Sequence, residues 1–294
     1  MSVILKGHSG CRLEVIYSGN KTIVRKTSKS IEYNPRLYLQ AEKQLSCSFD
    51  GFYTPQIYNV ALDKAGLCYI DMEYIPGVSV ANLLIDMQVD KIKELVRKLL
   101  TIRTEVYQPA ANTDREIFLN KILSINTSLH LINDKYVFES AIHQLNSYHW
   151  QIEKTFNCHG DLTFENILYW NDKIYLIDYL DTFFNSWKID AAKILQDLES
   201  KWSFRDQSEL PQNLIVRLKI FKQIFFEELL FMGMTFKDYS DLYHILLLSL
   251  LRIVPYSIYN QHTMLYLKSE VSKCLQNIAV LENTYENINN SLRR

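Results

Sequence analysis

The chain has 294 residues, of which 48% are hydrophobic and 22% are charged, so it can bury the core of one large domain or of two lobes. Its 32 basic residues nearly balance 33 acidic ones, and the net charge of -1 provides no overall field that would favour nucleic acid or an anionic membrane. The five scattered cysteines include no C-x-x-C pair, the start lacks a signal-like pattern, and the apolar run at residues 245–251 is too short for a span. These features predict a cytoplasmic protein with reduced thiols and without membrane insertion.

Short β-branched runs predict an antiparallel meander at the start of the chain. They lie at residues 3–6, 12–17 and 22–27, separated by Gly7-His8-Ser9-Gly10 and by a second turn at residues 18–21. Asn34-Pro35 then opens a predicted helix over residues 36–46, and two further strands are expected at 57–62 and 67–74.

Pro76-Gly77 predicts a boundary between a sheet-rich lobe, residues 1–75, and a helical lobe, residues 76–294. Apolar residues at three- and four-residue spacing predict helices at 89–107, 115–131, 137–154, 212–232, 239–254 and 264–281. Two strands, 167–170 and 173–179, interrupt this part and are joined by the turn-forming pair Asn171-Asp172. The expected class is therefore α+β with two lobes.

The strongest chemical signal is the polar run His159-Gly160-Asp161-Leu162-Thr163-Phe164-Glu165-Asn166, followed by Asp178 in an apolar strand. This set suits phosphoryl transfer. Asp161 can orient an acceptor hydroxyl and take its proton, while the Asn166 amide oxygen and the Asp178 carboxylate can hold Mg²⁺ against nucleotide phosphates. A plain polar loop is the alternative for the tripeptide alone, and the full spacing argues against it.

These residues resemble the aminoglycoside phosphotransferase and choline kinase family, which is related to protein kinases. His159-x-Asp161 with Asn166 looks like the family's catalytic loop, and Ile177-Asp178-Tyr179 looks like its metal-binding strand. The resemblance implies a two-lobed protein-kinase-like fold, with ATP and Mg²⁺ as cofactors. It implies that Asp161 and Asn166 are catalytic, that Asn166 and Asp178 bind the metal, and that His159 braces the loop.

In the small lobe, the resemblance implies a phosphate-binding cation at Lys26, although Arg25 remains an alternative because the strand register is open. It implies that Glu42 pairs with this cation. Ser9 would lie in the loop over the phosphates. The hinge would be built by the side chain of Met72 and by main-chain groups near Glu73 and Ile75, which would bind the adenine.

Acceptor residues are expected after Asp178, where acidic groups would suit an amino-sugar and aromatic rings a sugar or a quaternary ammonium, unless these aromatic residues belong to the core. The candidates are Asp181, Phe183, Phe184, Trp187, Glu199 and Trp202. Asp190 matches a structural residue of the family or a plain helix cap. Residues 193–203 faintly resemble phosphotransferase-like proteins of surface-polysaccharide synthesis.

The sequence therefore predicts an ATP-dependent kinase that phosphorylates a hydroxyl of a sugar, amino-sugar or amino-alcohol. Gly160 stands where protein kinases usually have Arg, and this favours a small-molecule acceptor. The alternatives are a Ser/Thr protein kinase and a nucleotide-binding scaffold without catalysis. The identity of the acceptor, the choice of ATP over GTP and the oligomeric state stay open.

Overall fold

A computed structural model describes residues 2–5, 10–18, 21–103 and 106–292 and divides the chain into two compact units. The first unit combines Met1–Leu83 with His159–Thr182, and the second combines Leu84–Cys158 with Phe183–Arg294. This division differs from the predicted one at residue 75, because the loop and hairpin around Asp161 belong with the N-terminal sheet. Strand β6 (Val78–Ser79), which follows Pro76-Gly77, pairs with β9 (Ile167–Trp170) and joins the two stretches of the first unit.

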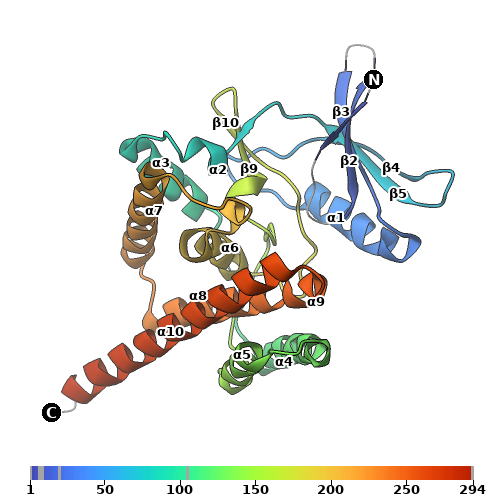
Figure 1. Cartoon of the computed structure of the whole chain (residues 1–294). Coiled ribbons are helices and arrows are strands. Elements are labelled where there is room, and N and C mark those ends of the chain that lie inside the picture. The colour runs from blue at the N-terminus through green and yellow to red at the C-terminus, as the bar shows by residue number, and fades with distance from the viewer. Residues whose placement is uncertain (1, 6–9, 19–20, 104–105, 293–294) are drawn as a thin grey trace. The chain divides into compact units, whose positions relative to one another are not determined.

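A five-stranded antiparallel sheet is the larger of the two sheets in the first unit (Figure 1). Its strands are β1 (Ser2–Leu5), β2 (Arg12–Ser18), β3 (Lys21–Thr27), β4 (Ile57–Leu62) and β5 (Cys68–Glu73), in the order β1-β2-β3-β5-β4. Val24 faces Met72 and Lys26 faces Ile70 across the β3–β5 pair. Since alternate residues share a face, Val24, Lys26, Ile70 and Met72 lie on the same side of the sheet.

Helix α1 (Asn34–Ser46) covers that side of the sheet. It follows a short 3₁₀ turn, η1 (Ile31–Tyr33), and Asn34 fixes its start by donating to Gly66 O and accepting from Cys68 N, each at 2.8 Å. The residues buried on α1 are Asn34, Leu37, Gln40, Ala41 and Gln44, a three- and four-residue spacing that marks one face of a helix. Leu37 and Ala41 pack on Cys68 and Ile70 to form the core of this lobe.

A second, smaller sheet in the same unit carries the hairpin after the polar loop. It has the order β10-β9-β6, where β10 is Lys173–Leu176, and short helix α2 (Val80–Leu83) follows β6. Asn171 and Asp172 have φ values of 48° and 58°, as the predicted two-residue turn requires. Tyr53 forms a bridge to β10 through hydrogen bonds with Ile174 O and Leu176 N, of 2.9 and 2.8 Å.

Strand β10 ends at Leu176, so the prediction of a strand to residue 179 was wrong. The amide of Ile177 donates to Asn166 O at 3.0 Å, and Asp178 adopts a left-handed conformation with φ 59°. Because of both features, the chain no longer continues the hydrogen-bonding pattern of the β9–β10 hairpin. Asp178 therefore lies in a loop immediately after the hairpin.

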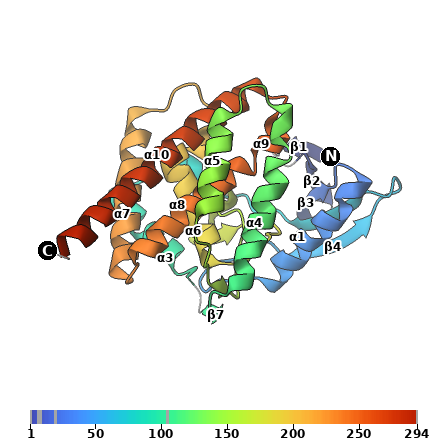
Figure 2. The same cartoon turned by 90° about the horizontal axis from the view of Figure 1, so that it is seen from below.

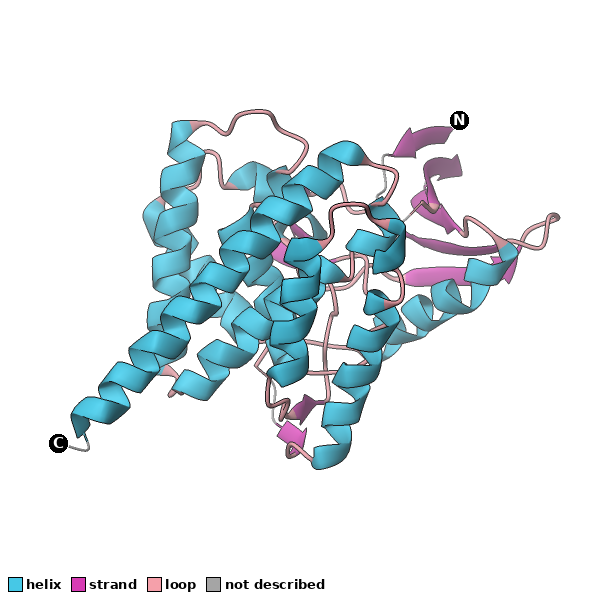
Figure 3. Ribbon diagram, turned by 60° about the horizontal axis from the view of Figure 1, so that its bottom comes forward, coloured by secondary structure: helices cyan, strands magenta, loops and turns pink. Residues whose placement is uncertain are grey.

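Helices form most of the described part of the second unit (Figure 3). They are α3 (Val89–Leu100), α4 (Asn112–Asn126), η2 (Leu129–Leu131), α5 (Tyr136–Ser147), α6 (Trp187–Ser200), η4 (Trp202–Phe204), α7 (Gln212–Phe231), α8 (Phe236–Leu251), α9 (Val254–Ser257) and α10 (Gln261–Leu292). Almost every residue of α6 is buried. Helix α10 runs along α8 and also contacts α5, and α7 packs on α3 (Figure 2).

Two predicted helices are shorter than expected. The helix from residue 89 ends at Leu100 instead of 107, and the helix from residue 137 ends at Ser147 instead of 154. The chain beyond each of them forms a strand, β7 (Val106–Gln108) and β8 (Lys154–Thr155), and these strands pair antiparallel. No helix in the described ranges has both the length and the apolar character that a membrane crossing requires.

Candidate active site

The loop from His159 to Asn166 holds the side chains of Asp161 and Asn166 together. It ends in one 3₁₀ turn, η3 (Phe164–Asn166), and the amides of Thr163 and Asn166 donate to Asp161 O and Thr163 O at 2.8 and 2.9 Å. The side-chain nitrogen of Asn166 donates to Asp161 O at 2.8 Å and to Asp161 Oδ2 at 3.3 Å. The side-chain oxygen of Asn166, Oδ1, is thus available to bind a metal.

Gly160 is required by the backbone of this loop. Its φ is 88°, a conformation that favours glycine, and a Cβ there would lie 2.3 Å from Leu180 O and 2.6 Å from Thr182 Cγ2. The loop can pass this close to residues 180–182 only because position 160 has no side chain.

His159 lies under the loop, fully buried. Its Nε2 donates to Ile177 O at 2.9 Å, and its Nδ1 accepts from the amide of Asp161 at 3.3 Å, a pattern that requires the neutral ring. Burial lowers the pKa of His159 to about 4, although the nearby carboxylate of Asp161 opposes this shift. The contacts fit the predicted bracing role, since they tie Asp161 to the segment before Asp178.

Asp178 forms an ion pair with Lys26. The Lys26 ammonium is buried and also donates to Gln40 Oε1 at 2.9 Å, whereas 46% of the Asp178 side chain is exposed. Burial alone would lower the pKa of Lys26, but the negative charge of Asp178 and its hydrogen bond more than offset this, and the pKa is raised. Lys26 is therefore a charged side chain beside the predicted metal ligand.

Arg25 lies on the other side of β3. Its guanidinium bonds both carboxylate oxygens of Asp71, at 2.6 and 2.7 Å, and lies 4.1 Å from the centre of the Tyr69 ring. The register thus places Lys26, and not Arg25, next to Asp178.

The prediction that Glu42 pairs with this lysine was wrong. Glu42 is exposed, and within the described ranges it forms no ion pair with Lys26; Gln40 contacts Lys26 instead. Two residues along a helix turn the side chain by about 200°, so Glu42 and Gln40 cannot share a face. The buried spacing of Leu37, Gln40, Ala41 and Gln44 was the signal in the sequence that could have identified Gln40.

Lys43 is a further residue that the sequence did not suggest. It follows Gln40 by one helical turn and donates to Thr182 Oγ1 at 3.1 Å. Its charge also contributes to the lowered pKa of His159. Lys43 thus links α1 to the segment after Asp178.

The predicted hinge residues lie at the end of β5 and just after it. Met72 is half-buried and packs against the Leu37–Ala41 core on the side of the sheet that carries Lys26. The amide of Glu73 is already bonded to Gln56 O at 2.8 Å, whereas the amide of Ile75 donates to no residue in the described part of the chain. Ser9, predicted in the phosphate loop, lies outside the described residues.

Asn166 and Asp178 fit a magnesium site that is completed by phosphate oxygens. Mg²⁺ commonly takes one or two protein oxygens together with substrate phosphates and water. Asp178 offers an exposed carboxylate, and Asn166 offers a carbonyl oxygen that the hydrogen bonds of its nitrogen leave unused. Among the residues that the structure describes, no group of three or more His, Cys, Asp or Glu side chains is arranged to hold a metal alone.

Several of the predicted acceptor residues belong to the core of the second unit. Phe184 and Trp187 are buried, and Phe183 packs edge-on against Phe118 at 5.2 Å. Trp202 is partly buried under the guanidinium of Arg205, 4.1 Å from its ring centre. Asp181, in the first unit, is exposed.

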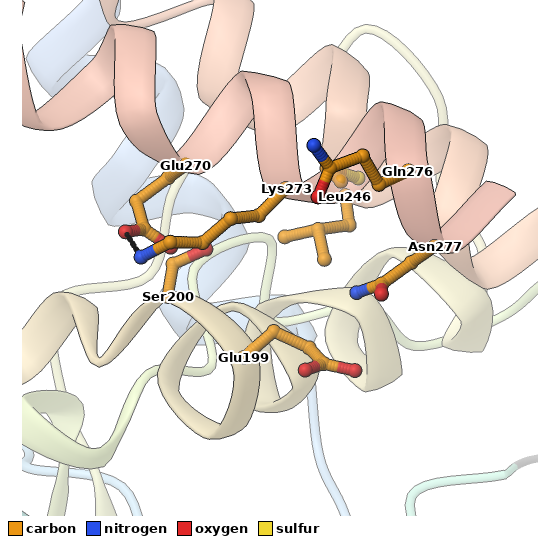
Figure 4. A pocket seen from close by; sticks show the side chains of 8 residues that line it. Glu199, Ser200, Leu246, Glu270, Lys273, Gln276 and Asn277 are labelled. Carbon is orange, nitrogen blue, oxygen red and sulfur yellow. Dashed lines mark hydrogen bonds and ion pairs between the residues drawn. The ribbon is translucent and has the colours of Figure 1, made fainter.

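Glu199 lines a cavity of about 230 Å³ between α6, α8 and α10 (Figure 4). Its other lining residues are Ser200, Leu246, Glu270, Lys273, Cys274, Gln276 and Asn277. Glu199 bonds Lys222 at 2.8 Å and the Tyr243 hydroxyl, and Glu270 bonds Lys273 at 2.6 Å. These partners tie Glu199 of α6 to α7 and α8, whereas the Glu270–Lys273 pair lies within α10.

The structural comparisons identify the fold. No protein-family model and no curated protein matches the sequence. Similar solved structures include an aminoglycoside phosphotransferase, APH(4)-Ia, as a thermostable mutant with ADP and hygromycin B, at 12% identity and TM-score 0.69, covering 94% of this chain and 93% of that one. An aminoglycoside phosphotransferase with GDP and kanamycin has 10% identity and TM-score 0.56, with 97% and 93% covered.

A fructosamine-3-kinase candidate from Haemophilus somnus is similar at 14% identity and TM-score 0.56, and the match covers 94% of this chain and 91% of that one. All these identities are low, so the likeness concerns the arrangement of the chain. It extends over nearly the full length of each protein, which confirms the α+β two-lobed architecture that the sequence predicted. The chain has the protein-kinase-like fold that is shared by aminoglycoside phosphotransferases and related small-molecule kinases.

Proposed function

We propose that this protein is an ATP- and Mg²⁺-dependent phosphotransferase that transfers the γ-phosphoryl group to a hydroxyl of a small molecule. The observation that carries the proposal is the convergence of Lys26, Asp161, Asn166 and Asp178 within one compact unit of a kinase-like fold. Lys26 and Asp178 are 152 positions apart in the sequence and yet form an ion pair. Three separate segments thus bring together the groups that phosphoryl transfer needs.

Each residue has a defined task in this proposal. Lys26 binds the α- and β-phosphates, and Asp161 orients the acceptor hydroxyl and accepts its proton as the new O–P bond forms and the bond to the β-phosphate breaks. Asn166 and Asp178 would hold Mg²⁺, which would supply positive charge to neutralise the phosphates. Met72 contacts the base, and the amide of Ile75 and the carbonyl of Glu73 bond its edge.

A small molecule is the preferred acceptor class. In protein kinases a long activation segment follows the metal-binding aspartate and holds the peptide substrate. Here only residues 179–186 separate Asp178 from the first turn of α6. This short connection has no room for such a segment, so a sugar, amino-sugar or amino-alcohol is the more suitable acceptor. The link to surface polysaccharides stays a prediction from the sequence.

The proposal is tested by turnover of ATP with a panel of amino-sugars, sugars and amino-alcohols. Asp161→Asn should lower kcat by about 10²- to 10⁴-fold, the typical contribution of a positioned general base, and should leave nucleotide affinity within about threefold. Asp172→Asn is the matched control, because Asp172 is exposed in a turn of the same unit that accepts Asn. Equal turnover in Asp161→Asn and the control would refute the role of Asp161.

A further inference from the structure

We propose that Lys26 serves as an internal counter-cation of Asp178 which a divalent metal has to displace, and that the neutral Gln40 sets the strength of this competition. This inference rests on the proposed function, because it takes Asp178 as the metal ligand. It concerns how the metal and the nucleotide depend on each other when they bind.

Lys26 has only one carboxylate partner within the described part of the chain. Its ammonium bonds Asp178 Oδ1 and the uncharged Gln40 Oε1, and both Lys26 and Gln40 are almost completely buried. Another buried lysine, Lys188 in the second unit, has three carboxylates within 2.9 Å. The positive charge of Lys26 is therefore compensated almost entirely by Asp178.

The carboxylate of Asp178 that pairs with Lys26 is also the group that a metal ion would use. Nearly half of the Asp178 side chain is exposed, so a cation from solvent can reach it, but one of its oxygens is already bonded to a buried ammonium. A metal that binds alone leaves Lys26 without its only counter-ion, which is costly for a buried charge. Nucleotide phosphates would offer Lys26 a new anionic partner, and metal and nucleotide should then bind cooperatively.

Gln40 sets the strength of the coupling between metal binding and nucleotide binding. Its amide oxygen holds Lys26 in place at 2.9 Å and adds no charge. A glutamate at position 40 would give Lys26 a second carboxylate, weaken its attraction to Asp178 and free that carboxylate for metal. Gln40→Glu should therefore bind metal well without nucleotide, whereas Gln40→Met should not.

The test is Mn²⁺ binding to the full-length protein, followed by electron paramagnetic resonance of the free ion, with and without AMP-PNP. Without nucleotide, Gln40→Glu should bind Mn²⁺ at least about fivefold more tightly than the natural protein, which is the lower end of usual coupling between sites. Leu39→Glu is the control, since Leu39 is exposed next to Gln40 and gains the same charge. Equal Mn²⁺ affinity in Gln40→Glu and the natural protein would overturn the inference.

Two further variants separate the possible failures. If Gln40→Glu does not fold, Lys26→Met provides the same test, because removal of the counter-cation should also strengthen Mn²⁺ binding without nucleotide; an unchanged affinity would overturn the inference. Asp178→Asn should abolish the nucleotide-dependent Mn²⁺ binding. If that binding persists in Asp178→Asn, the metal site of the proposed function is wrong, and the counter-cation inference falls with it.

Discussion

The loop from His159 to Asn166 depends on Gly160, because any side chain at this position would collide with the backbone of residue 180. Gly160→Ala should lower the free energy of unfolding by about 3 kcal/mol or more, because it combines a left-handed conformation with a Cβ placed 2.3 Å from Leu180 O. It should also lower kcat, since Asp161 is the next residue. Urea unfolding and steady-state kinetics measure both effects.

Gly233→Ala is the matched control for this prediction. Gly233 has a similar φ of 81°, but nothing lies within 4 Å of the position of its Cβ. Only the backbone preference is lost there, at a cost of about 1 kcal/mol. If both variants lose the same stability, the close approach at Gly160 does not constrain the loop.

Two buried histidines make stability depend on pH. Burial lowers the pKa of His159 to about 4 and that of His244 also to about 4, from 6.5 in the unfolded chain. The unfolded state then binds more protons between these values, so stability is full above pH 6.5 and is lost as the pH falls toward 4. From pH 7 to pH 5 each histidine should remove about 2 kcal/mol from the free energy of unfolding.

Urea unfolding at pH 7, 6 and 5 measures this loss. His244→Asn should reduce the loss by about half, because one of the two histidines is removed. His262→Asn, at an exposed position in the first turn of α10, should leave the loss unchanged. If the free energy of unfolding of the natural protein did not change from pH 7 to pH 5, this would contradict the neutral, buried state of His159.

At the scale of the elements, a buried charge cluster joins α6 to α8 in the second unit. Lys188 is 2% exposed and lies within 2.9 Å of Glu153, Asp238 and Asp241, and Asp241 is itself fully buried. Lys188→Met would leave Asp241 with Lys237 as its one remaining cationic partner in the structure. The variant should lose about 3–5 kcal/mol in urea unfolding, as expected when one partner of a buried pair is removed.

Lys91→Met controls for the loss of a lysine. The Lys91–Glu94 pair is 65% exposed on both sides, and an exposed pair of this kind contributes at most about 1 kcal/mol. Similar losses in Lys188→Met and Lys91→Met would show that the cluster does not stabilise the contact between α6 and α8.

How far the sequence predicts an element depends on whether a repeating pattern defines it. The strands of the first sheet and the turn at Asn171-Asp172 were predicted closely, because alternation and turn residues are local signals. The end of β10 was missed, because the amide of Ile177 bonds to Asn166, the residue just before β9, and this contact has no local sequence signal. The Glu42 prediction failed because it followed the ion pair that the family resemblance implies and not the helical spacing that buries Gln40.

Where one motif contains the candidate residues, the sequence already indicated that they lie close together. The spacing from Asp161 to Asn166 and Asp178 is a sequence feature, and the structure brings these residues together in one unit. The choice of Lys26 over Arg25 depended on strand register, and the division of the chain depended on the pairing of β6 with β9. Both depend on pairings between strands that lie far apart in the chain, and a single sequence does not reveal these pairings.

For the whole molecule, nucleotide binding should depend on metal. ATP at about 100 times its Kd should add about 2.7 kcal/mol to the free energy of unfolding in the presence of Mg²⁺, and should raise the Tm by several degrees. Asp178→Asn should remove the Mg²⁺ dependence of this rise. A thermal-shift series with ATP, GTP, Mg²⁺ and EDTA measures it. If ATP gives no Mg²⁺-dependent stabilisation, the result would support a scaffold without catalysis.

Phosphoryl transfer to a small molecule is tested most directly with a metabolite extract. The purified protein is incubated with the extract, ATP and Mg²⁺, and mass spectrometry follows which compounds gain one phosphoryl group. At least one small hydroxyl compound should gain a single phosphate with the natural protein and none should do so with Asp161→Asn. The absence of any phosphorylated compound with the natural protein, or the same product with Asp161→Asn, would contradict the assignment of Asp161 as the catalytic carboxylate of a small-molecule kinase.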